Sequence, residues 1–325
     1  MTISTPRPGT PGWTRPLGST GVSVTAVCAG GSPLGSMPLL YGRDVSRDEG
    51  VATVAAVLHS AIRTIDTSNG YSDGESERRI GAALAAVGGK PDDVVVITKV
   101  DARGRDYSGD RVRASVLESK QRLGLDQLPL VHLHDPEAFD FDELTARGGA
   151  VDALVALKES GAVGSIGLAG GRVQEIARYL ALDVFDVLLV HNRWTLLDRS
   201  AGDLLSEAAA RGLGLVNAAV YGGGLLAGDG TSGPARYGYR PAPVEIVQAV
   251  DAMRRVCAEH GTDLRTAALQ HSLRDPRFAT TVVGMSRPSR VASTLEAAAR
   301  EVPEGLWEEL EVLLPPARVW LDAPL

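Results

Sequence analysis

The sequence predicts a single (β/α)8 barrel, an α/β fold in which helices surround a ring of parallel strands. The first observation is that short apolar runs alternate with amphipathic helical patterns eight times along the chain. The second is length: 325 residues, 44% of them hydrophobic, can bury one large core, and no linker divides them. We therefore expect one barrel domain over residues 15–325, preceded by a flexible segment over residues 1–14.

The expected strands are short runs rich in β-branched residues, bounded by turn residues such as glycine, proline or asparagine. They cover residues 22–29, 63–67, 94–99, 128–134, 163–168, 187–191, 215–219 and 280–283. The expected helices carry apolar residues at three- and four-residue spacing. They cover residues 46–62, 76–84, 112–123, 151–160, 173–182, 204–211, 244–260, 264–273 and 289–299, and the first opens with the capping box Ser46-Arg47-Asp48-Glu49.

The charge and cysteine content exclude several classes of protein. A net charge of −7 and an isoelectric point near 5.5 argue against nucleic acid and anionic membranes as partners, because both call for a basic surface. The two cysteines, Cys28 and Cys257, fall in apolar patterns and predict neither a disulfide nor a metal site. No stretch reaches about 18 uninterrupted apolar residues. We expect a cytoplasmic protein that is a monomer or a small homo-oligomer.

Polar side chains follow three neighbouring strands of the predicted barrel. Asp66 ends one strand and Tyr71 lies in the loop above it, while Lys99 and His134 end the next two strands. Because the carboxyl ends of the strands meet at one rim of such a barrel, these four side chains are expected to converge there. Each one alone has an ordinary structural explanation, as an ion pair, a loop residue or a packed histidine. The four together predict an active site.

The motifs around these residues resemble those of the aldo-keto reductases. The chain has Asp-Thr at 66–67, a tyrosine five positions on at Tyr71, and Ser-Glu-Arg-Arg-Ile-Gly at 76–81. Thr-Lys at 98–99 and His-Asp-Pro at 134–136 follow in the order of that family. The resemblance covers nearly the whole chain and implies an oxidoreductase with an NADP or NAD cofactor, of which NADP is favoured. It also implies that an N-terminal β-hairpin closes the barrel floor.

Within the family, the chain looks most similar to the aldose 1-dehydrogenases that act on D-threo-aldoses, L-fucose and L-galactose. The residues at 31–35, 191–197, 216–221 and 224–227 carry this likeness. It implies oxidation of an aldose at C1 to the lactone. The alternative is an aldehyde or ketone reductase of the same family, so the expected partner is a small carbonyl or sugar substrate.

The chemistry explains why these four residue types would be needed. Tyrosine titrates near pH 10, so exchanging a proton near neutral pH calls for a cation beside it, which Lys99 would supply. Asp66 would hold the buried Lys99 in place. His134 would hydrogen-bond the substrate oxygen and orient it while a hydride passes between the substrate and the nicotinamide. Asn192, Arg193 and Asn217 are expected to bring hydrogen-bonding groups for a polyol to the rim.

The cofactor residues are inferred mainly from the resemblance. No G-x-G-x-x-G or P-loop sequence is present, so a Rossmann or P-loop site is not expected. The expected cofactor contacts are Gly31, Asn192, Tyr221, Gly284, Ser286, Arg287, Arg290 and Thr294. The chain departs from the family in three places: Gly284-Met285 replaces a Lys-Ser pair, Ser293-Thr294 replaces the Glu-Asn that follows, and Ala169-Gly170 replaces the Ser-Asn that holds the carboxamide. Tyr221 or Trp194 would stack on the nicotinamide.

Two other functions remain open from the residues alone. His132 and His134 lie two apart on one strand and His191 ends another, which allows a metal-dependent barrel hydrolase. A non-catalytic subunit that keeps the fold and cofactor is the second. Because the histidine pair lacks a clear set of carboxylate partners and the four rim residues are intact, we predict an enzyme without a metal.

Overall fold

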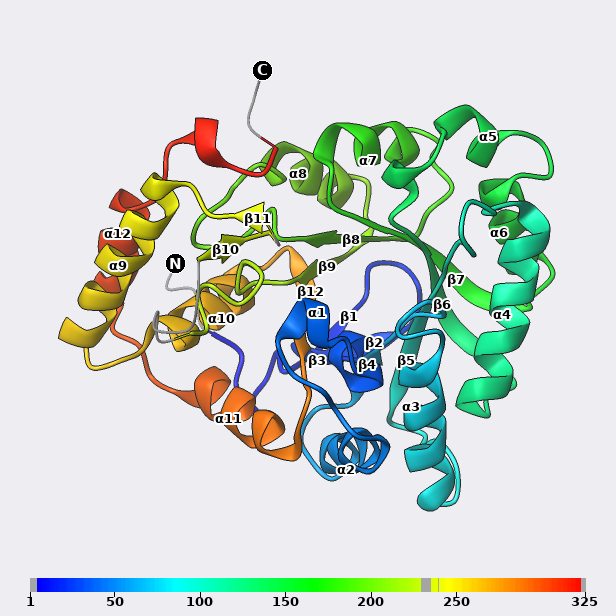
Figure 1. The fold of residues 1–325 in the computed structure, drawn as a ribbon, viewed down its shortest axis with the longest axis horizontal. Helices are drawn as coiled ribbons and strands as arrows, with labels where there is room; N and C mark the ends of the chain where they lie inside the picture. The colour runs from blue at the N-terminus through cyan, green and yellow to red at the C-terminus, as the bar shows by residue number, and fades with distance from the viewer. Residues whose placement is uncertain (1–4, 229–234, 239, 323–325) are drawn as a thin grey trace.

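The computed structural model describes residues 5–228, 235–238 and 240–322 and confirms the predicted barrel (Figure 1). Eight strands form a closed ring in the order β12-β3-β4-β5-β6-β7-β8-β9, and every neighbouring pair in it is parallel. The strands are β3 Val27–Gly30, β4 Thr64–Asp66, β5 Val95–Val100, β6 Leu128–His134, β7 Val163–Gly170, β8 Val187–His191, β9 Gly214–Ala218 and β12 Phe278–Gly284.

Helices surround the strands, as Figure 1 shows. The longer ones are α2 Arg47–Leu58, α3 Glu75–Ala86, α4 Gly109–Leu123, α6 Ala150–Glu159, α7 Val173–Leu180, α8 Gly202–Ala210, α9 Val244–Glu259, α10 Leu264–Arg274, α11 Pro288–Ala299 and α12 Gly305–Val312. The shorter ones are η1 Ser32–Gly35, α1 Pro38–Tyr41, η2 Pro136–Ala138, α5 Phe141–Thr145 and η3 Ala317–Val319. The predicted cap of α2 is present, since the Ser46 side chain accepts the amide of Glu49 at 3.1 Å.

A β-hairpin lies against the amino ends of the barrel strands, as the resemblance implied. Its strands are β1 Thr14–Pro16 and β2 Ser23–Thr25, paired antiparallel. Leu17 at its turn is fully buried and packs with Val187 and Val216 inside the barrel. A side chain on Gly214 would come within 2.8 Å of Leu17, so this close approach requires a glycine at the start of β9. The hairpin therefore closes the floor, opposite the rim that carries Asp66 and His134.

The structure differs from the sequence expectation at both ends of the chain and in the loop after β9. The predicted strand 22–29 is divided: residues 23–25 belong to the hairpin, and the barrel strand begins only at Val27. Helix α12 and a second small hairpin, β10 Arg236–Tyr237 with β11 Arg240–Pro241, were not expected. In the predicted flexible segment, residues 1–4 lie outside the described residues, and the Trp13 indole donates to the Ala61 carbonyl at 2.8 Å.

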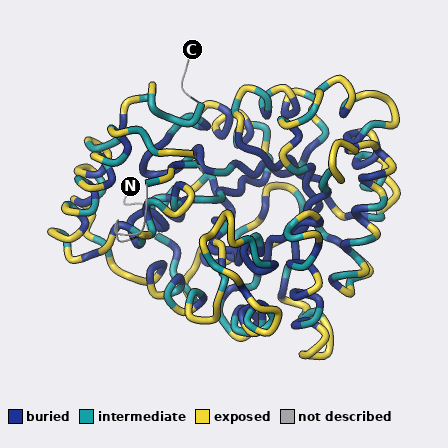
Figure 2. The backbone as a smooth tube through the Cα atoms, viewed as in Figure 1, coloured by how far each residue is buried: buried dark blue, intermediate teal, exposed yellow. Residues whose placement is uncertain are grey.

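The buried residues run along the central strands, and the outward faces of the helices carry the exposed ones (Figure 2). Within the described part of the chain, no helix combines the length and the apolar character needed to cross a bilayer.

Leu17→Ala is predicted to destabilise the protein by about 2–5 kcal/mol, because the removed atoms leave a cavity at the sealed end of the barrel. The measurement is the urea midpoint followed by circular dichroism. Leu39→Ala is the matched control, since Leu39 in α1 is fully exposed and its loss should leave the midpoint unchanged. Equal midpoints for both variants would show that the hairpin does not contribute to the core.

Candidate active site

The structure brings the four predicted rim residues together. Asp66 is the last residue of β4, Lys99 the penultimate residue of β5 and His134 the last residue of β6. Tyr71 lies in the loop between β4 and α3, with its ring edge-on to that of His134 at a centroid distance of 5.6 Å. The four side chains thus meet at the carboxyl-end rim of the barrel, where the sequence predicted them.

Lys99 is the centre of this group and is almost completely buried. Its Nζ lies 2.6 Å from Asp66 Oδ1, 2.7 Å from the Thr67 carbonyl and 3.3 Å from the Tyr71 hydroxyl. An ammonium has three N–H donors, so each has one acceptor here. Because Lys99 donates to the phenolic oxygen, the O–H of Tyr71 is left to point toward a substrate.

The Ser76-Glu77 pair at the start of α3 fixes the loop that carries Tyr71. The Ser76 hydroxyl lies 2.8 Å from both the Gly31 carbonyl and the Thr67 hydroxyl. Glu77 is fully buried and accepts hydrogen bonds from Thr98 at 2.6 Å and from the Arg122 guanidinium at 3.1 Å. The motif therefore positions Tyr71 by tying its loop to β3 and β5.

The pKa of Tyr71 differs from the sequence expectation. Burial raises the pKa of this phenol well above 10, and the negative charges of Asp66, Asp101 and Asp135 add to the effect. We expected Lys99 to favour the phenolate, but its ammonium is paired with Asp66 at 2.6 Å. These surroundings favour the protonated form of Tyr71, which is a hydrogen-bond donor.

Asp101 is a polar rim residue that the sequence analysis missed. It follows β5 directly, and its Oδ1 lies 2.6 Å from Nδ1 of His134. Burial lowers the pKa of His134, but the carboxylates of Asp101 and Asp135 raise it by more, and the net shift is upward. The sequence could have indicated Asp101 by its position, because it lies two residues after Lys99 at the end of a barrel strand.

Several predicted cofactor residues carry features that fit an anionic nucleotide. Arg287 precedes α11, whose N-terminus has no side-chain cap, and Arg290 lies in its first turn. Burial lowers the pKa of Arg290, and the charges of Arg265 and Arg287 lower it further. Among the described residues none of these three arginines forms an ion pair with a carboxylate. Three cations around an uncapped helix N-terminus match the phosphates of a dinucleotide.

Two further buried polar groups in the predicted cofactor set have no well-formed hydrogen bond in the described structure. These are the Oδ1 of Asn192, a residue with a left-handed φ of 62°, and the hydroxyl of Tyr221. The Arg265 guanidinium lies close enough to interact with the Tyr221 hydroxyl, which connects this group to the arginine cluster. Unsatisfied buried polar atoms are rare, so they mark positions where a ligand can supply the missing hydrogen bond.

The remaining predicted cofactor residues are Gly284, Ser286, Thr294 and Gly31. Gly284 ends β12 and is exposed, and Ser286 follows it, with its carbonyl 3.5 Å from Arg43 Nη1. Thr294 is buried within α11. Gly31 lies after β3, and a Cβ there would come 2.9 Å from the Asp66 carbonyl. The close packing beside Asp66 therefore requires this glycine.

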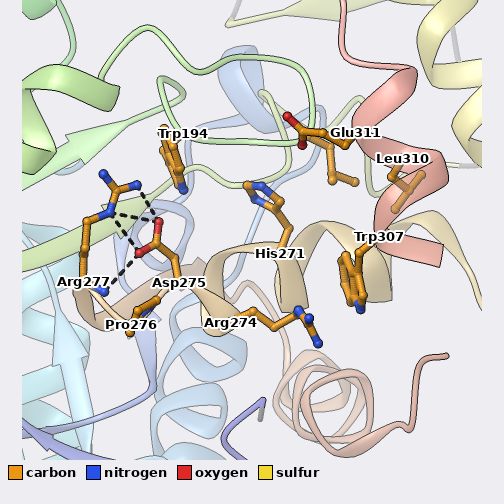
Figure 3. Close-up of a pocket in the computed structure, with 10 residues that line it drawn as sticks. Trp194, His271, Arg274, Asp275, Pro276, Arg277, Trp307, Leu310 and Glu311 are labelled. Atoms are coloured by element: carbon orange, nitrogen blue, oxygen red, sulfur yellow. Dashed lines mark hydrogen bonds and ion pairs between the residues drawn. The ribbon is translucent and has the colours of Figure 1, made fainter. Parts of the chain in front are cut away.

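Three side chains that were expected to contact ligands at the rim make contacts with other parts of the protein. The Asn217 amide is buried and donates to the Trp194 carbonyl at 2.9 Å and to Ser272 of α10 at 2.8 Å. Arg193 pairs with Asp322. Trp194 lines a separate cavity of about 410 Å³ that has none of the four rim residues in its wall. Figure 3 shows Trp194 there with His271 and Trp307, so its expected stacking on a nicotinamide is not supported.

The histidines considered for a metal site do not act together. His132 is fully buried in the barrel beside the backbone of Leu168, and burial holds its pKa well below the usual value. Among the described residues, one group has ligand atoms within 4.8 Å of one another, and it joins His191 to Asp135 and Glu137. Neither His132 nor His134 belongs to it, so the histidine set of the hydrolase alternative is not assembled.

A closed parallel barrel with an ion pair, a tyrosine and a histidine converging at its rim defines an enzyme of the (β/α)8 class. Comparison with known proteins gives the family: residues 26–314 match the Aldo/keto reductase family, and the chain belongs to it. It is therefore an oxidoreductase, in place of the hydrolase and non-catalytic alternatives.

Two relatives and one solved structure illustrate the similarity. The chain is 32% identical over 318 residues to the D-threo-aldose 1-dehydrogenase of a Pseudomonas species, covering 89% of this chain and 94% of the relative. It is 32% identical over 322 residues to the L-galactose dehydrogenase of Arabidopsis thaliana, covering 94% and 95%. An aldo-keto reductase from Bacillus halodurans has the same fold, with a TM-score of 0.76 over 95% of this chain and 98% of its own, at 22% identity.

Proposed function

We propose that this protein is an NAD(P)-dependent dehydrogenase that oxidises the C1 hydroxyl of a cyclic aldose to the lactone. The observation that carries the proposal is the Tyr71 hydroxyl 3.3 Å from Lys99 Nζ and beside His134, an arrangement suited to proton exchange with a substrate oxygen. The sugar substrate is supported by the two aldose-type dehydrogenases at 32% identity over most of both chains.

Each rim residue has a definite task in this chemistry. When bound, the nicotinamide ring supplies the hydride acceptor or donor. In oxidation the Tyr71 phenolate accepts the proton of the reacting hydroxyl, and in reduction the Tyr71 O–H donates it to the carbonyl oxygen. Asp66 holds the Lys99 ammonium by the 2.6 Å contact. His134 offers its Nε2 to the same oxygen and orients it.

Polar groups beside His134 suit a polyol. Asp135 has a half-exposed carboxylate whose Oδ1 lies 3.4 Å from His191 Nε2, and its Oδ2 lies 3.8 Å from His134 Nε2. The carboxylate of Asp135 and the imidazole of His191, both beside His134, can bind neighbouring sugar hydroxyls. These groups replace Arg193 and Asn217, which the sequence suggested for this task.

For the cofactor, we propose NADP in preference to NAD. Arg265, Arg287 and Arg290 would hold the phosphates, with Arg290 at the 2′-phosphate. Asn192 would offer its free oxygen to the nicotinamide carboxamide, because Ala169-Gly170 provides no polar side chain there. Tyr221 remains the candidate for stacking.

An NADPH-linked aldehyde or ketone reductase is the second candidate, and one observation favours it. Because the pKa of Tyr71 is raised by burial, the residue is ready to donate a proton to a carbonyl oxygen and less ready to accept one from an alcohol. Comparing the catalytic efficiency on aldoses with that on aldehydes separates the two activities.

Tyr71→Phe is predicted to lower kcat by roughly a hundredfold or more, because the proton donor and acceptor is lost. Cofactor affinity, measured by fluorescence titration, should be retained because the ring keeps its packing. Tyr179→Phe, which removes another buried hydroxyl, is the control and should keep wild-type turnover. Near wild-type turnover in Tyr71→Phe would contradict the assignment of the proton-transfer residue.

Arg290→Ala is predicted to raise the dissociation constant of NADP more than that of NAD, because a contact with the 2′-phosphate is available only to NADP. Both constants can be measured by isothermal titration. Arg300→Ala at the other end of α11 should change neither. Equal losses for NADP and NAD in Arg290→Ala would show that Arg290 does not read the 2′-phosphate.

Catalytic efficiency is predicted to be higher for NAD(P)-linked oxidation of aldoses than for NADPH-linked reduction of aldehydes. The test compares L-fucose, L-galactose and D-arabinose with aromatic and aliphatic aldehydes, following cofactor absorbance. A clear preference for the aldehydes would reject the sugar dehydrogenase and leave the reductase.

A further inference from the structure

The histidine at the rim is held on one side by a carboxylate. Asp101 Oδ1 lies 2.6 Å from His134 Nδ1, whereas His134 Nε2 has no hydrogen-bond partner among the described residues. An ionised carboxylate can only accept a hydrogen bond, so Nδ1 of His134 must carry a proton. Nε2 is therefore the nitrogen left free to meet a substrate.

The backbone around Asp101 is shaped to hold its carboxylate. The Gly70 amide donates to Oδ2 at 2.7 Å, and the Ser68 hydroxyl donates a short hydrogen bond to the same oxygen. A Cβ on Gly70 would lie 2.8 Å from Asp101 Cγ. Glycine is thus required at this position for the loop of Tyr71 to come close enough to bind Asp101.

A buried tyrosine fixes the distance between Asp101 and His134. The Tyr107 hydroxyl accepts the His134 amide at 2.9 Å and donates to the Val100 carbonyl at 2.8 Å. Tyr107 is 4% exposed, so these contacts are shielded from water. They join the end of β5 to the end of β6, and Asp101 directly follows Val100.

The charges around His134 come from three elements. Strand β5 contributes Lys99, and Asp101 follows directly after that strand. Strand β6 contributes His132, and Asp135 follows directly after its last residue, His134. The loop after β4 contributes Tyr71, which packs against the His134 ring. Burial and Lys99 disfavour a charged imidazole, whereas the two carboxylates favour it and prevail. Burial opposes ionisation of Asp101, yet His134, Ser68 and Gly70 bring its pKa below the usual value.

We propose that Asp101 is a positioning residue that fixes the tautomer of His134 and sets the charge of the ring facing the reacting oxygen. The inference rests on the proposed function, because it requires His134 to face that oxygen. With Nδ1–H bound to Asp101, a neutral ring accepts at Nε2 the hydrogen bond of a substrate hydroxyl. The protonated ring donates at Nε2 to a substrate carbonyl. Loss of the carboxylate should therefore shift the pH range of each reaction direction.

The test compares wild type with Asp101→Asn, which keeps the shape and removes the charge, and Asp101→Ala, which removes both. NMR titration of the His134 Cε1–H, assigned with His134→Gln, gives the pKa of His134 directly. The pH dependence of kcat/KM for reduction of 4-nitrobenzaldehyde with NADPH gives its kinetic counterpart. In Asp101→Asn the NMR pKa and the falling limb of activity should both move down by about one unit or more. Asp101→Ala should lose more activity at every pH than Asp101→Asn.

Asp110→Asn is the control, because Asp110 in α4 is exposed and should leave both pH values unchanged. Ser68→Ala is a second variant that weakens the hold on Asp101 without removing it, and it should give a smaller shift in the same direction. If the NMR pKa of His134 in Asp101→Asn stays at the wild-type value, the inference is overturned. It is also overturned if the falling limb of kcat/KM does not move with the NMR pKa. The proposed function would fail differently, by wild type preferring the aldehydes to the aldoses, a result that leaves the NMR pKa comparison unaffected.

Discussion

The buried ion pair of Lys99 and Asp66 is the constraint on which the rest of the site depends. Taking both charges out of water costs several kcal/mol per ion, and their attraction offsets this only when the remaining donors are also satisfied. Thr67 and Tyr71 satisfy the other two donors of Lys99. The position of the Tyr71 hydroxyl is thereby part of what makes the buried ammonium tolerable.

The barrel places the buried polar groups of the site at one end and many of the apolar contacts that stabilise the fold at the other. All eight strands are parallel, so their polar carboxyl-end residues gather at one rim, while the hairpin with Leu17 seals the other end with apolar side chains. Glu77 shows how the two requirements meet. Burial raises the pKa of this carboxyl, yet its bonds to Thr98 and Arg122 hold the Tyr71 loop against the strands. The buried network of Glu77, Thr98 and Arg122 therefore costs desolvation energy but fixes the position of the loop that carries Tyr71.

The sequence predicted the strands and the four rim residues because strand ends can be read from apolar runs that stop at polar residues. It could not predict the direction of side chains beyond those ends. Asn217 lies near the end of β9 but turns toward α10, and Trp194 turns toward a cavity lined by α10 and α12. Asp101 was missed for a related reason, since its partner His134 lies 33 residues away and only the register of β5 against β6 brings them together.

The two titratable groups beside the reacting oxygen are pushed into different states by their surroundings. Burial among carboxylates keeps Tyr71 protonated, because its charged form is an anion. The same carboxylates favour the charged form of His134, because that form is a cation. Asp101 and Asp135 therefore favour the protonated form of both rings, which is neutral for Tyr71 and a cation for His134. The reacting oxygen is thus expected to meet one phenolic O–H and one imidazole whose charged form is favoured, and Asp101 contacts only the imidazole.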